Sequence, residues 1–167
     1  MRKIKVLDNF LDETEFSNIQ DFLIGKSRAS FPWYYSNVVT NDDPKEHFQF
    51  IHIFYANFGP SSDFFPVISN LILKLKIKSL VRIKANLLTT TQEIIEHKFH
   101  YDQPERNTGM KVAIFYLNTN NGYTLFEDGR KVESVQNRMV VFDGDMAHTG
   151  TSCTDQNVRA VINFNYF

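Results

Sequence analysis

The second half of the chain is a succession of short segments rich in Val, Ile, Phe and Tyr, and no other feature constrains the fold as strongly. Turn signals separate the segments at near-regular spacing, among them NTNNG at 118–122, EDG at 127–129 and DGD at 143–145. The segments read LVRIKANLL, EIIEHKFHYD, KVAIFYLN, YTLFED, KVESV, RMVVFD and VRAVINFNYF. Short strands at this spacing are typical of an all-β sandwich or barrel. We therefore expect a β core over residues 81–167.

The first half of the chain mixes helical and strand patterns. Asp12 can cap a helix that Gly25 ends, and the apolar side chains between them recur at helical spacing. IKVLDNF at the start of the chain predicts a short strand that runs into a turn. Further along, PWYYSNVV and HFQFIHIFYANF predict strands, VISNLILKL predicts a second helix, and KLKIK alternates as a strand would.

Length and composition indicate one globular domain. The chain has 167 residues, of which 43% are hydrophobic and 22% charged, so one substantial core can form but two cannot. We expect a single domain over 1–167, in which residues 1–80 are a helical and aromatic support region for the β core.

Charge and cysteine usage exclude several classes of protein. The formal net charge of −1 provides no field that would draw the chain to nucleic acid or an anionic membrane, and the basic stretch Lys74–Lys84 is interpreted as a solvated face. Cys153 is the only cysteine, which rules out an internal disulfide and a Cys-rich zinc site and favours a cytoplasmic protein. Asp8 and Asn9 interrupt the N-terminus before any signal peptide could form, and no apolar run is long enough to span a membrane.

Two histidines and an aspartate crowd into the stretch EHKFHYD. Alternate side chains of a strand share a face, so His100 and Asp102 would point one way and His97 the other. His100 and Asp102 would then offer two metal ligands and need a third. The alternative is a polar strand end with a hydrogen-bonded histidine, and a lone His-X-Asp pair does not decide against it.

The third ligand has to come from elsewhere in the chain, and the histidines outside this segment are His47, His52 and His148. We favour His148, because it follows MVVFDGDMA at the boundary of a strand and a turn, and the strands in between can bring it back to Asp102. Two histidines and one carboxylate on one face of an octahedron leave three positions open, which is the arrangement of non-haem Fe(II) oxygenases.

Arg159 is a cation in the otherwise apolar terminal segment NVRAVINFNYF. The apolar side chains of one strand face would pack against the N-terminal helices, leaving Arg159 and Asn163 on the interior face. A buried guanidinium needs an anionic partner, which a bound dicarboxylate would supply. The alternative is an ion pair with a nearby Asp or Glu.

Taken together, these residues resemble the Fe(II)/2-oxoglutarate-dependent dioxygenases, and within them the prolyl 4-hydroxylase-like branch. The opening VLDNFLDETEF also resembles that branch. The motifs that carry the resemblance occur in the family's order: His100-Tyr101-Asp102, FYLN at 115–118, NGYTLFEDG at 121–129, VVFDGDMAH at 140–148 and RAVINF at 159–164.

The resemblance implies a mainly β fold, the double-stranded β-helix or distorted jelly roll, with supporting N-terminal helices. It implies that His100, Asp102 and His148 hold Fe(II) and that Arg159 binds the distal carboxylate of 2-oxoglutarate, with O₂ as the other co-substrate. Hydroxylation is the outcome that it implies.

Three further residues are candidates for 2-oxoglutarate binding. By resemblance, the hydroxyl of Tyr116 assists the distal carboxylate, although a core tyrosine bonded to the backbone is an equal alternative. Asn163 matches a small polar position near the same carboxylate, and Asn86 is a third candidate.

The substrate is not readable from the sequence. A peptidyl proline is the first expectation by resemblance and a free small molecule the second, whereas the near-neutral charge argues against nucleic acid. The polar loop Gln103–Gly109 and the aromatic segment Phe31–Asn37 are candidates for the rim of the site, with core packing as the alternative for the aromatic residues. The rival hypothesis for the whole chain is a metal-binding or structural jelly-roll module without turnover. The oligomeric state is not predicted.

Overall fold

The computed structural model describes residues 2–25, 31–40, 44, 47–102 and 108–167. Within these residues the protein is mainly β, with two α-helices, α1 (Glu13–Ile24) and α2 (Ser69–Leu75), and a short 3₁₀ helix, Phe65–Ile68. The strands are β1 (Lys5–Leu7), β2 (Tyr34–Ser36), β3 (Gln49–Ala56), β4 (Gly59–Pro60), β5 (Leu80–Thr89), β6 (Lys111–Tyr116), β7 (Tyr123–Phe126), β8 (Lys131–Glu133), β9 (Met139–Asp143), β10 (His148–Gly150) and β11 (Val158–Tyr166).

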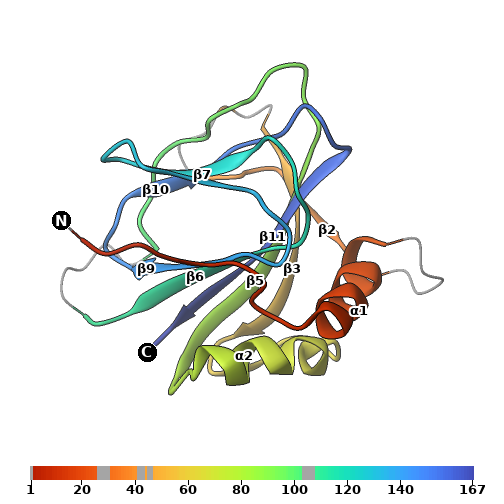
Figure 1. Ribbon diagram of the computed structural model, residues 1–167, viewed down its shortest axis with the longest axis vertical. Helices are drawn as coiled ribbons and strands as arrows, with labels where there is room; N and C mark the ends of the chain where they lie inside the picture. The colour runs from red at the N-terminus through yellow and green to blue at the C-terminus, as the bar shows by residue number, and fades with distance from the viewer. Residues whose placement is uncertain (1, 26–30, 41–43, 45–46, 103–107) are drawn as a thin grey trace.

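Two antiparallel sheets face each other, as in a jelly roll. The large sheet has the strand order β1-β9-β6-β11-β5-β3-β2, with β4 paired to β3, and the small sheet has the order β10-β7-β8. The small sheet lies above the middle of the large one, and both helices lie below it (Figure 1). This arrangement confirms the predicted fold class.

The helices and the outer face of the large sheet enclose one part of the core. Phe16, Ile19 and Leu23 of α1 are buried there with Phe115 of β6 and Ile162 of β11. The rings of Phe16 and Phe115 meet edge to face with centroids 6.1 Å apart, and each such buried side chain contributes on the order of 1.5–3 kcal/mol. The apolar face predicted for the terminal strand therefore packs against the helices, as expected.

A second cluster lies between the two sheets. Val112, Tyr116, Phe126 and Phe142 are fully or almost fully buried in it. The rings of Phe126 and Phe142 are perpendicular, with centroids 4.9 Å apart. The ring of Phe142 also lies 4.7 Å from the ring of His148, so this cluster borders the polar residues described below.

The local signals for α1 act as the sequence predicts. The Asp12 carboxylate accepts a hydrogen bond of 2.9 Å from the backbone N–H of Glu15, and Gly25 ends the helix. The strand predicted for KLKIK is wrong, because no residue of this segment lies in a strand. Lys74 and Leu75 belong to α2, Lys76 ends it in the left-handed conformation, and β5 begins only at Leu80.

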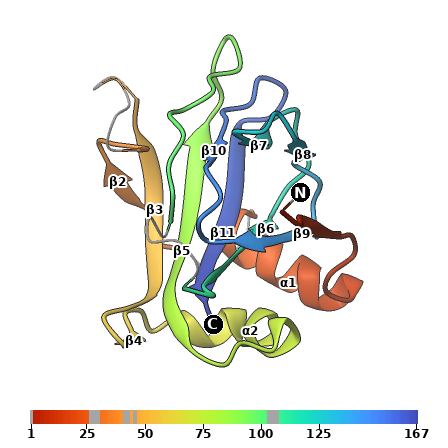
Figure 2. The ribbon, with the colours of Figure 1, turned by 90° about the vertical axis from the view of Figure 1, so that its left-hand side faces the viewer.

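The strand predicted for EIIEHKFHYD is also wrong. This segment makes only two isolated bridges, Glu96 with Thr151 and His100 with His148. The segment lies alongside β10 in space. Strand β10 was not predicted from the sequence, because HTG is too short to show alternation. Strands β1 to β4 show in addition that residues 1–80 contribute directly to the large sheet, beyond the supporting role expected for them (Figure 2).

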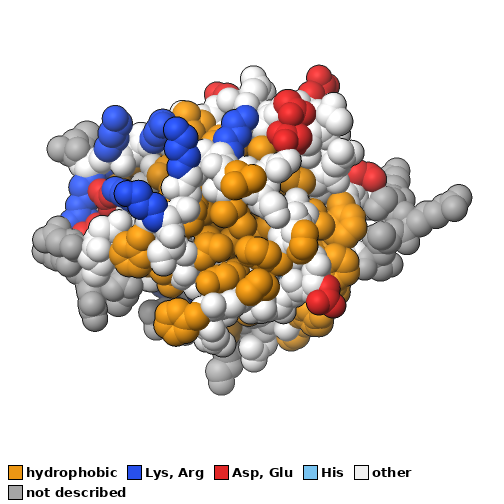
Figure 3. Space-filling view, turned by 90° about the horizontal axis from the view of Figure 1, so that it is seen from below, with side chains coloured by type: hydrophobic (Ala, Val, Ile, Leu, Met, Phe, Trp, Pro, Cys, Tyr) orange, Lys and Arg blue, Asp and Glu red, His pale blue; other side chains and the backbone are white. Residues whose placement is uncertain are grey.

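Seen from below, the surface of the molecule has hydrophobic side chains gathered in the middle and Lys and Arg side chains along one side (Figure 3). Leu73 of α2 is 74% exposed. In the described part of the chain, no helix has both the length and the apolar character needed to cross a membrane.

Candidate metal centre

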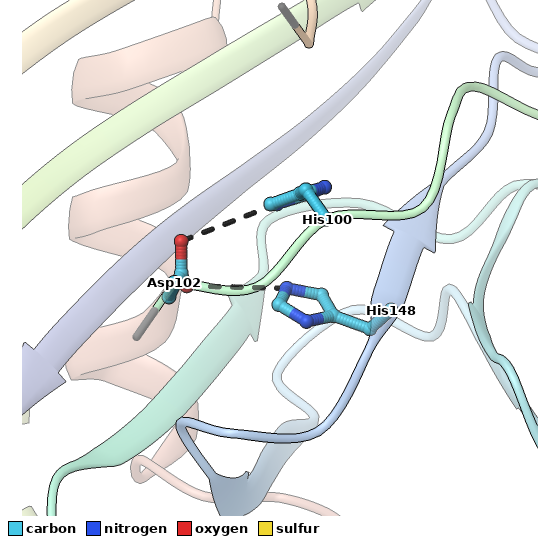
Figure 4. Close-up of side chains that lie close together, drawn as sticks. All are labelled: His100, Asp102 and His148. Carbon is cyan, nitrogen blue, oxygen red and sulfur yellow. Dashed lines mark ion pairs between the residues drawn. The ribbon is translucent and has the colours of Figure 1, made fainter. Parts of the chain in front are cut away.

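His100, Asp102 and His148 lie close together and line one cavity with residues of both sheets. Their ligand atoms all lie within 4.8 Å of one another. The Oδ1 atom of Asp102 is 4.0 Å from Nε2 of His100, and Oδ2 is 3.9 Å from Nε2 of His148. Both rings and the carboxylate point toward a common centre (Figure 4). Such separations allow a single divalent cation to be bound between the three groups.

The backbone fixes the two imidazoles beside each other. His100 and His148 exchange hydrogen bonds, from N–H of His100 to the carbonyl of His148 at 3.0 Å and in return at 3.1 Å. Nδ1 of His148 lies 3.1 Å from the Met146 carbonyl oxygen, which it can meet only as a donor, so the lone pair of Nε2 faces the centre. Burial lowers the pKa of His148 to about 4, which leaves the ring neutral near pH 7 and able to bind a metal.

Asp102 is held by three polar side chains from the large sheet. Nη2 of Arg82 donates to Oδ1 at 3.1 Å, and the amides of Asn163 and Asn165 donate to Oδ2 at 3.2 and 2.9 Å. Burial alone would raise the pKa of Asp102, but the charge of His148 when that ring is protonated, the charge of Arg82 and the Asn165 amide outweigh it and lower that pKa. The carboxylate is therefore ionised and fixed in orientation.

The remaining histidines take no part in this cluster. His97 is buried, with its ring 5.2 Å from that of His47. The ring nitrogens of His52 are 2.8 Å from the Pro32 carbonyl and 2.8 Å from the Ser62 hydroxyl. The predicted choice among the histidines matches this geometry, although the strand from which it was argued is absent.

Arg159 lines the same cavity. The cavity has a volume of about 320 Å³ and reaches from Arg159 to the three candidate ligands. The side chain is 4% exposed and donates to the hydroxyls of Ser134 at 2.9 Å and Thr124 at 3.4 Å. Among the described residues no carboxylate pairs with it. Burial lowers its pKa, since desolvation disfavours the charge.

The other predicted residues lie at different points of the cavity. The hydroxyl of Tyr116 donates to Thr124 Oγ1 at 2.7 Å, so Tyr116 and Arg159 share that threonine, and the Arg159 guanidinium lies 5.8 Å from the Tyr116 ring. Asn86 lines the cavity. Asn163 lines it too, but its amide points at Asp102, on the metal side of the cavity.

The predicted rim residues are only partly described. Residues 103–107 of the polar loop lie outside the described residues. In the aromatic segment, Trp33 packs on Phe31 and donates to the Leu23 carbonyl at 3.1 Å, which is core packing, whereas Tyr34 and Tyr35 are exposed.

Sequence reasoning missed the residues that surround these groups. Arg82 and Lys84 were interpreted as part of a solvated face, but both line the cavity. With the candidate Asn86 they alternate with Ile83 and Ala85 along β5, and this alternation was a readable signal that the strand turns a polar face to the cavity.

Gly122 was missed as well. A Cβ at this position would lie 2.7 Å from Cδ of Arg159 and 2.6 Å from the Ser152 carbonyl oxygen, so the absence of a side chain makes room for the guanidinium.

Comparison with known proteins identifies the fold to which this site belongs. No family model and no curated protein match the sequence. Among solved structures, a prolyl hydroxylase from Trichoplax adhaerens, in complex with a hypoxia-inducible factor oxygen degradation domain peptide, has a TM-score of 0.71 and 13% identity over 100% of this chain and 84% of its own. An oxidoreductase of the 2OG-Fe(II) oxygenase family from Burkholderia pseudomallei has a TM-score of 0.71 and 13% identity over 98% and 84%. This chain has the 2OG-Fe(II) oxygenase fold.

The same fold occurs in an enzyme described as an epimerase. The non-haem alpha-ketoglutarate-dependent epimerase SnoN from nogalamycin biosynthesis matches with a TM-score of 0.62 and 14% identity over 99% of this chain and 78% of its own. These likenesses confirm the predicted double-stranded β-helix.

Proposed function

We propose that this protein is an Fe(II)- and 2-oxoglutarate-dependent dioxygenase that hydroxylates its substrate. The observation that carries the proposal is the pairing, in one cavity, of a two-histidine, one-carboxylate cluster with the buried guanidinium of Arg159, which no described carboxylate neutralises. A metal-binding module without turnover would have no use for that cation, so this pairing argues against the rival hypothesis.

The donor set fits Fe(II). Two imidazoles and one carboxylate form the facial arrangement of non-haem iron oxygenases and leave coordination positions for a bidentate co-substrate and O₂. His148 is neutral and Asp102 ionised near pH 7, so neither has to lose a proton to bind the metal. When bound, Fe(II) with 2-oxoglutarate and O₂ supplies the oxidising chemistry: one oxygen atom enters the substrate C–H bond, and the other leaves in succinate, with release of CO₂.

Arg159 would bind the distal carboxylate of 2-oxoglutarate. Its position far from solvent strengthens a charge-assisted pair, and the hydroxyls of Thr124 and Ser134 hold the guanidinium in place. Tyr116 would orient Thr124 through its 2.7 Å hydrogen bond and thereby support the same carboxylate. Asn163 would act on the metal side through Asp102.

A peptide is the first candidate substrate, because the Trichoplax adhaerens neighbour is described in complex with a peptide fragment. A free small molecule is the second. We further propose a cytoplasmic location, in keeping with the free, buried thiol of Cys153.

The proposal is tested by succinate formation. The purified protein is given Fe(II), 2-oxoglutarate and air, and succinate is measured with and without Fe(II). We expect Fe(II)-dependent succinate even without substrate, at a low rate. His148→Ala should abolish iron binding and succinate formation, whereas the control His97→Gln, outside the cluster, should retain both. Equal losses in the two variants, with both folded by circular dichroism, would refute the assignment of the ligands.

A further inference from the structure

Strand β5 turns a row of polar side chains toward the cavity. Arg82, Lys84 and Asn86 line it, while Ile83 and Ala85 between them are completely buried on the opposite face against the helices. Two neighbouring cations on the inner face of a sheet are costly unless each has an anionic partner. Arg82 has one, because it donates to Asp102.

Lys84 has no such partner among the described residues. In the strand register it lies opposite Asn163 of β11 on one side and Ile53 of β3 on the other. No described side chain or carbonyl forms a hydrogen bond or ion pair with its ammonium group. Burial, followed by the charge of Arg82, lowers the pKa of Lys84 to about 8, with Asp102 opposing the shift. At pH 7 the amine is still largely protonated, so Lys84 is a cation in the cavity that no described carboxylate pairs with.

The co-substrates do not neutralise this cation. This step rests on the proposed function, in which the distal carboxylate of 2-oxoglutarate pairs with Arg159 and its other carboxylate binds the metal. Asp102 serves both the metal and Arg82. In the loaded enzyme the Lys84 ammonium would therefore still have no anionic partner among the described residues and the co-substrate, and the metal would add further positive charge nearby.

A buried acceptor without a hydrogen-bond partner lies next to Lys84. The amide nitrogen of Asn163 donates to Asp102, but its oxygen Oδ1 is buried and has no hydrogen-bond partner. An amide oxygen can only accept a hydrogen bond. Side by side, Lys84 and Asn163 thus offer a cation for an anionic group and an acceptor for an N–H or O–H group.

We propose that Lys84 and Asn163 form the substrate-binding site, and that it takes a carboxylate with an N–H or O–H donor close to it. This is the chemistry of an amino or hydroxy acid. The carboxylate pairs with the Lys84 ammonium, and the adjacent donor binds Oδ1 of Asn163. Because Asn163 also contacts Asp102, the acid lies next to the metal and its C–H bonds are presented for hydroxylation. The acid is either free or the C-terminal residue of a peptide.

The test uses matched acid and amide probes. The protein is loaded with redox-inert Zn(II) and saturating 2-oxoglutarate, which occupies Arg159, and binding is measured by ligand-observed NMR and calorimetry. The probes are the free L-amino acids and their carboxamides, and tripeptides that end in the same residues with free or amidated C-termini. We expect at least one acid to bind about tenfold or more tightly than its amide, as for the loss of a charge-assisted hydrogen bond.

Variants assign the preference to Lys84. Lys84→Met should reduce the difference between acid and amide to less than about threefold, and Lys84→Arg, which keeps the charge, should restore most of it. The matched control is Lys78→Met, at an exposed lysine just before the same strand, which should behave as the wild type. Binding of free acids alone identifies a small-molecule substrate, and binding of tripeptides alone identifies a peptide C-terminus. Either outcome supports the inference.

The inference fails if wild-type protein binds acids and amides equally, if no acid binds, or if Lys84→Met keeps the acid preference. Failure of the proposed function is a separate result. It would appear as absent Fe(II)-dependent succinate formation and absent 2-oxoglutarate binding in the wild type, both of which are measured without any acid probe.

Discussion

Replacing Arg159 with methionine tests whether this residue matters for the stability of the protein or for its affinity for 2-oxoglutarate. The guanidinium is 4% exposed, and its described partners are two hydroxyls, one at 2.9 Å and one at the long distance of 3.4 Å. Burying such a charge costs several kcal/mol, and each hydrogen bond to a charged donor returns about 1.5–3 kcal/mol. The two terms nearly cancel, so Arg159→Met should change the free energy of unfolding of the metal-free protein by less than about 2 kcal/mol in either direction.

The effect on 2-oxoglutarate binding should be far larger. Without the guanidinium, the distal carboxylate would enter a buried site that holds only hydroxyl groups. Loss of a buried charge partner costs about 2–5 kcal/mol, which corresponds to a rise in Kd of roughly 30-fold to several thousand-fold. The assays are urea unfolding of the metal-free protein and calorimetric titration of 2-oxoglutarate into the Zn(II)-loaded protein.

Arg130→Met is the matched control. It removes an arginine that pairs with Asp128 outside the cavity, so both quantities should stay within about 1 kcal/mol of the wild type. The reasoning about Arg159 is refuted if Arg159→Met loses more than about 3 kcal/mol of stability while the Kd for 2-oxoglutarate changes by less than threefold. That pattern would mean that Arg159 is a structural residue.

Three further substitutions test the surroundings of the site. Asn165→Ala removes the 2.9 Å hydrogen bond to Asp102 and should weaken metal binding about 10- to 100-fold in a chelator competition, while unchanged affinity would exclude an orienting role. Lys84→Met should stabilise the metal-free protein at pH 7 in urea unfolding. The pKa of Lys84 is about 8 in the folded protein and 10.5 ordinarily, so the stability advantage of Lys84→Met over the wild type should shrink as the pH rises from 8 to 10.5. A stability difference that does not change with pH would contradict the burial of a charged Lys84 as its cause. Gly122→Ala should displace Arg159, since the new Cβ would lie 2.7 Å from its Cδ. The thermal midpoint and the affinity for 2-oxoglutarate should both fall, and unchanged values would show that the neighbours yield easily.

Much of the fold follows from local signals in the sequence. The helix that begins after Asp12 has a cap, a stop and an apolar stripe, and the terminal strand has strict alternation between a helix-facing and a cavity-facing side. Such patterns depend on nearby residues only, so they survive in the folded protein. The segment before Asp102 behaves differently. Its conformation is set by two bridges, to His148 of β10 and to Thr151 just after β10, and both partners are far away in the sequence.

The candidate site was predictable where residue type alone is informative. His100, Asp102, His148 and Arg159 stand out because few other side chains can bind a metal or a carboxylate. Lys84 did not stand out, because a lysine in a strand looks like a solvated residue until the packing on both sides is known. Its meaning depends on the buried neighbours in β3 and β11, which pair with it only in the folded sheet.

The central claim is that one metal ion and 2-oxoglutarate bind together at His100, Asp102, His148 and Arg159. The most direct measurement is the visible absorption spectrum of the protein with Fe(II) and 2-oxoglutarate in the absence of O₂. The account predicts a charge-transfer band that requires both additions and that is missing in His148→Ala. A wild-type protein that is folded and saturated with both components, yet shows no such band, would contradict it.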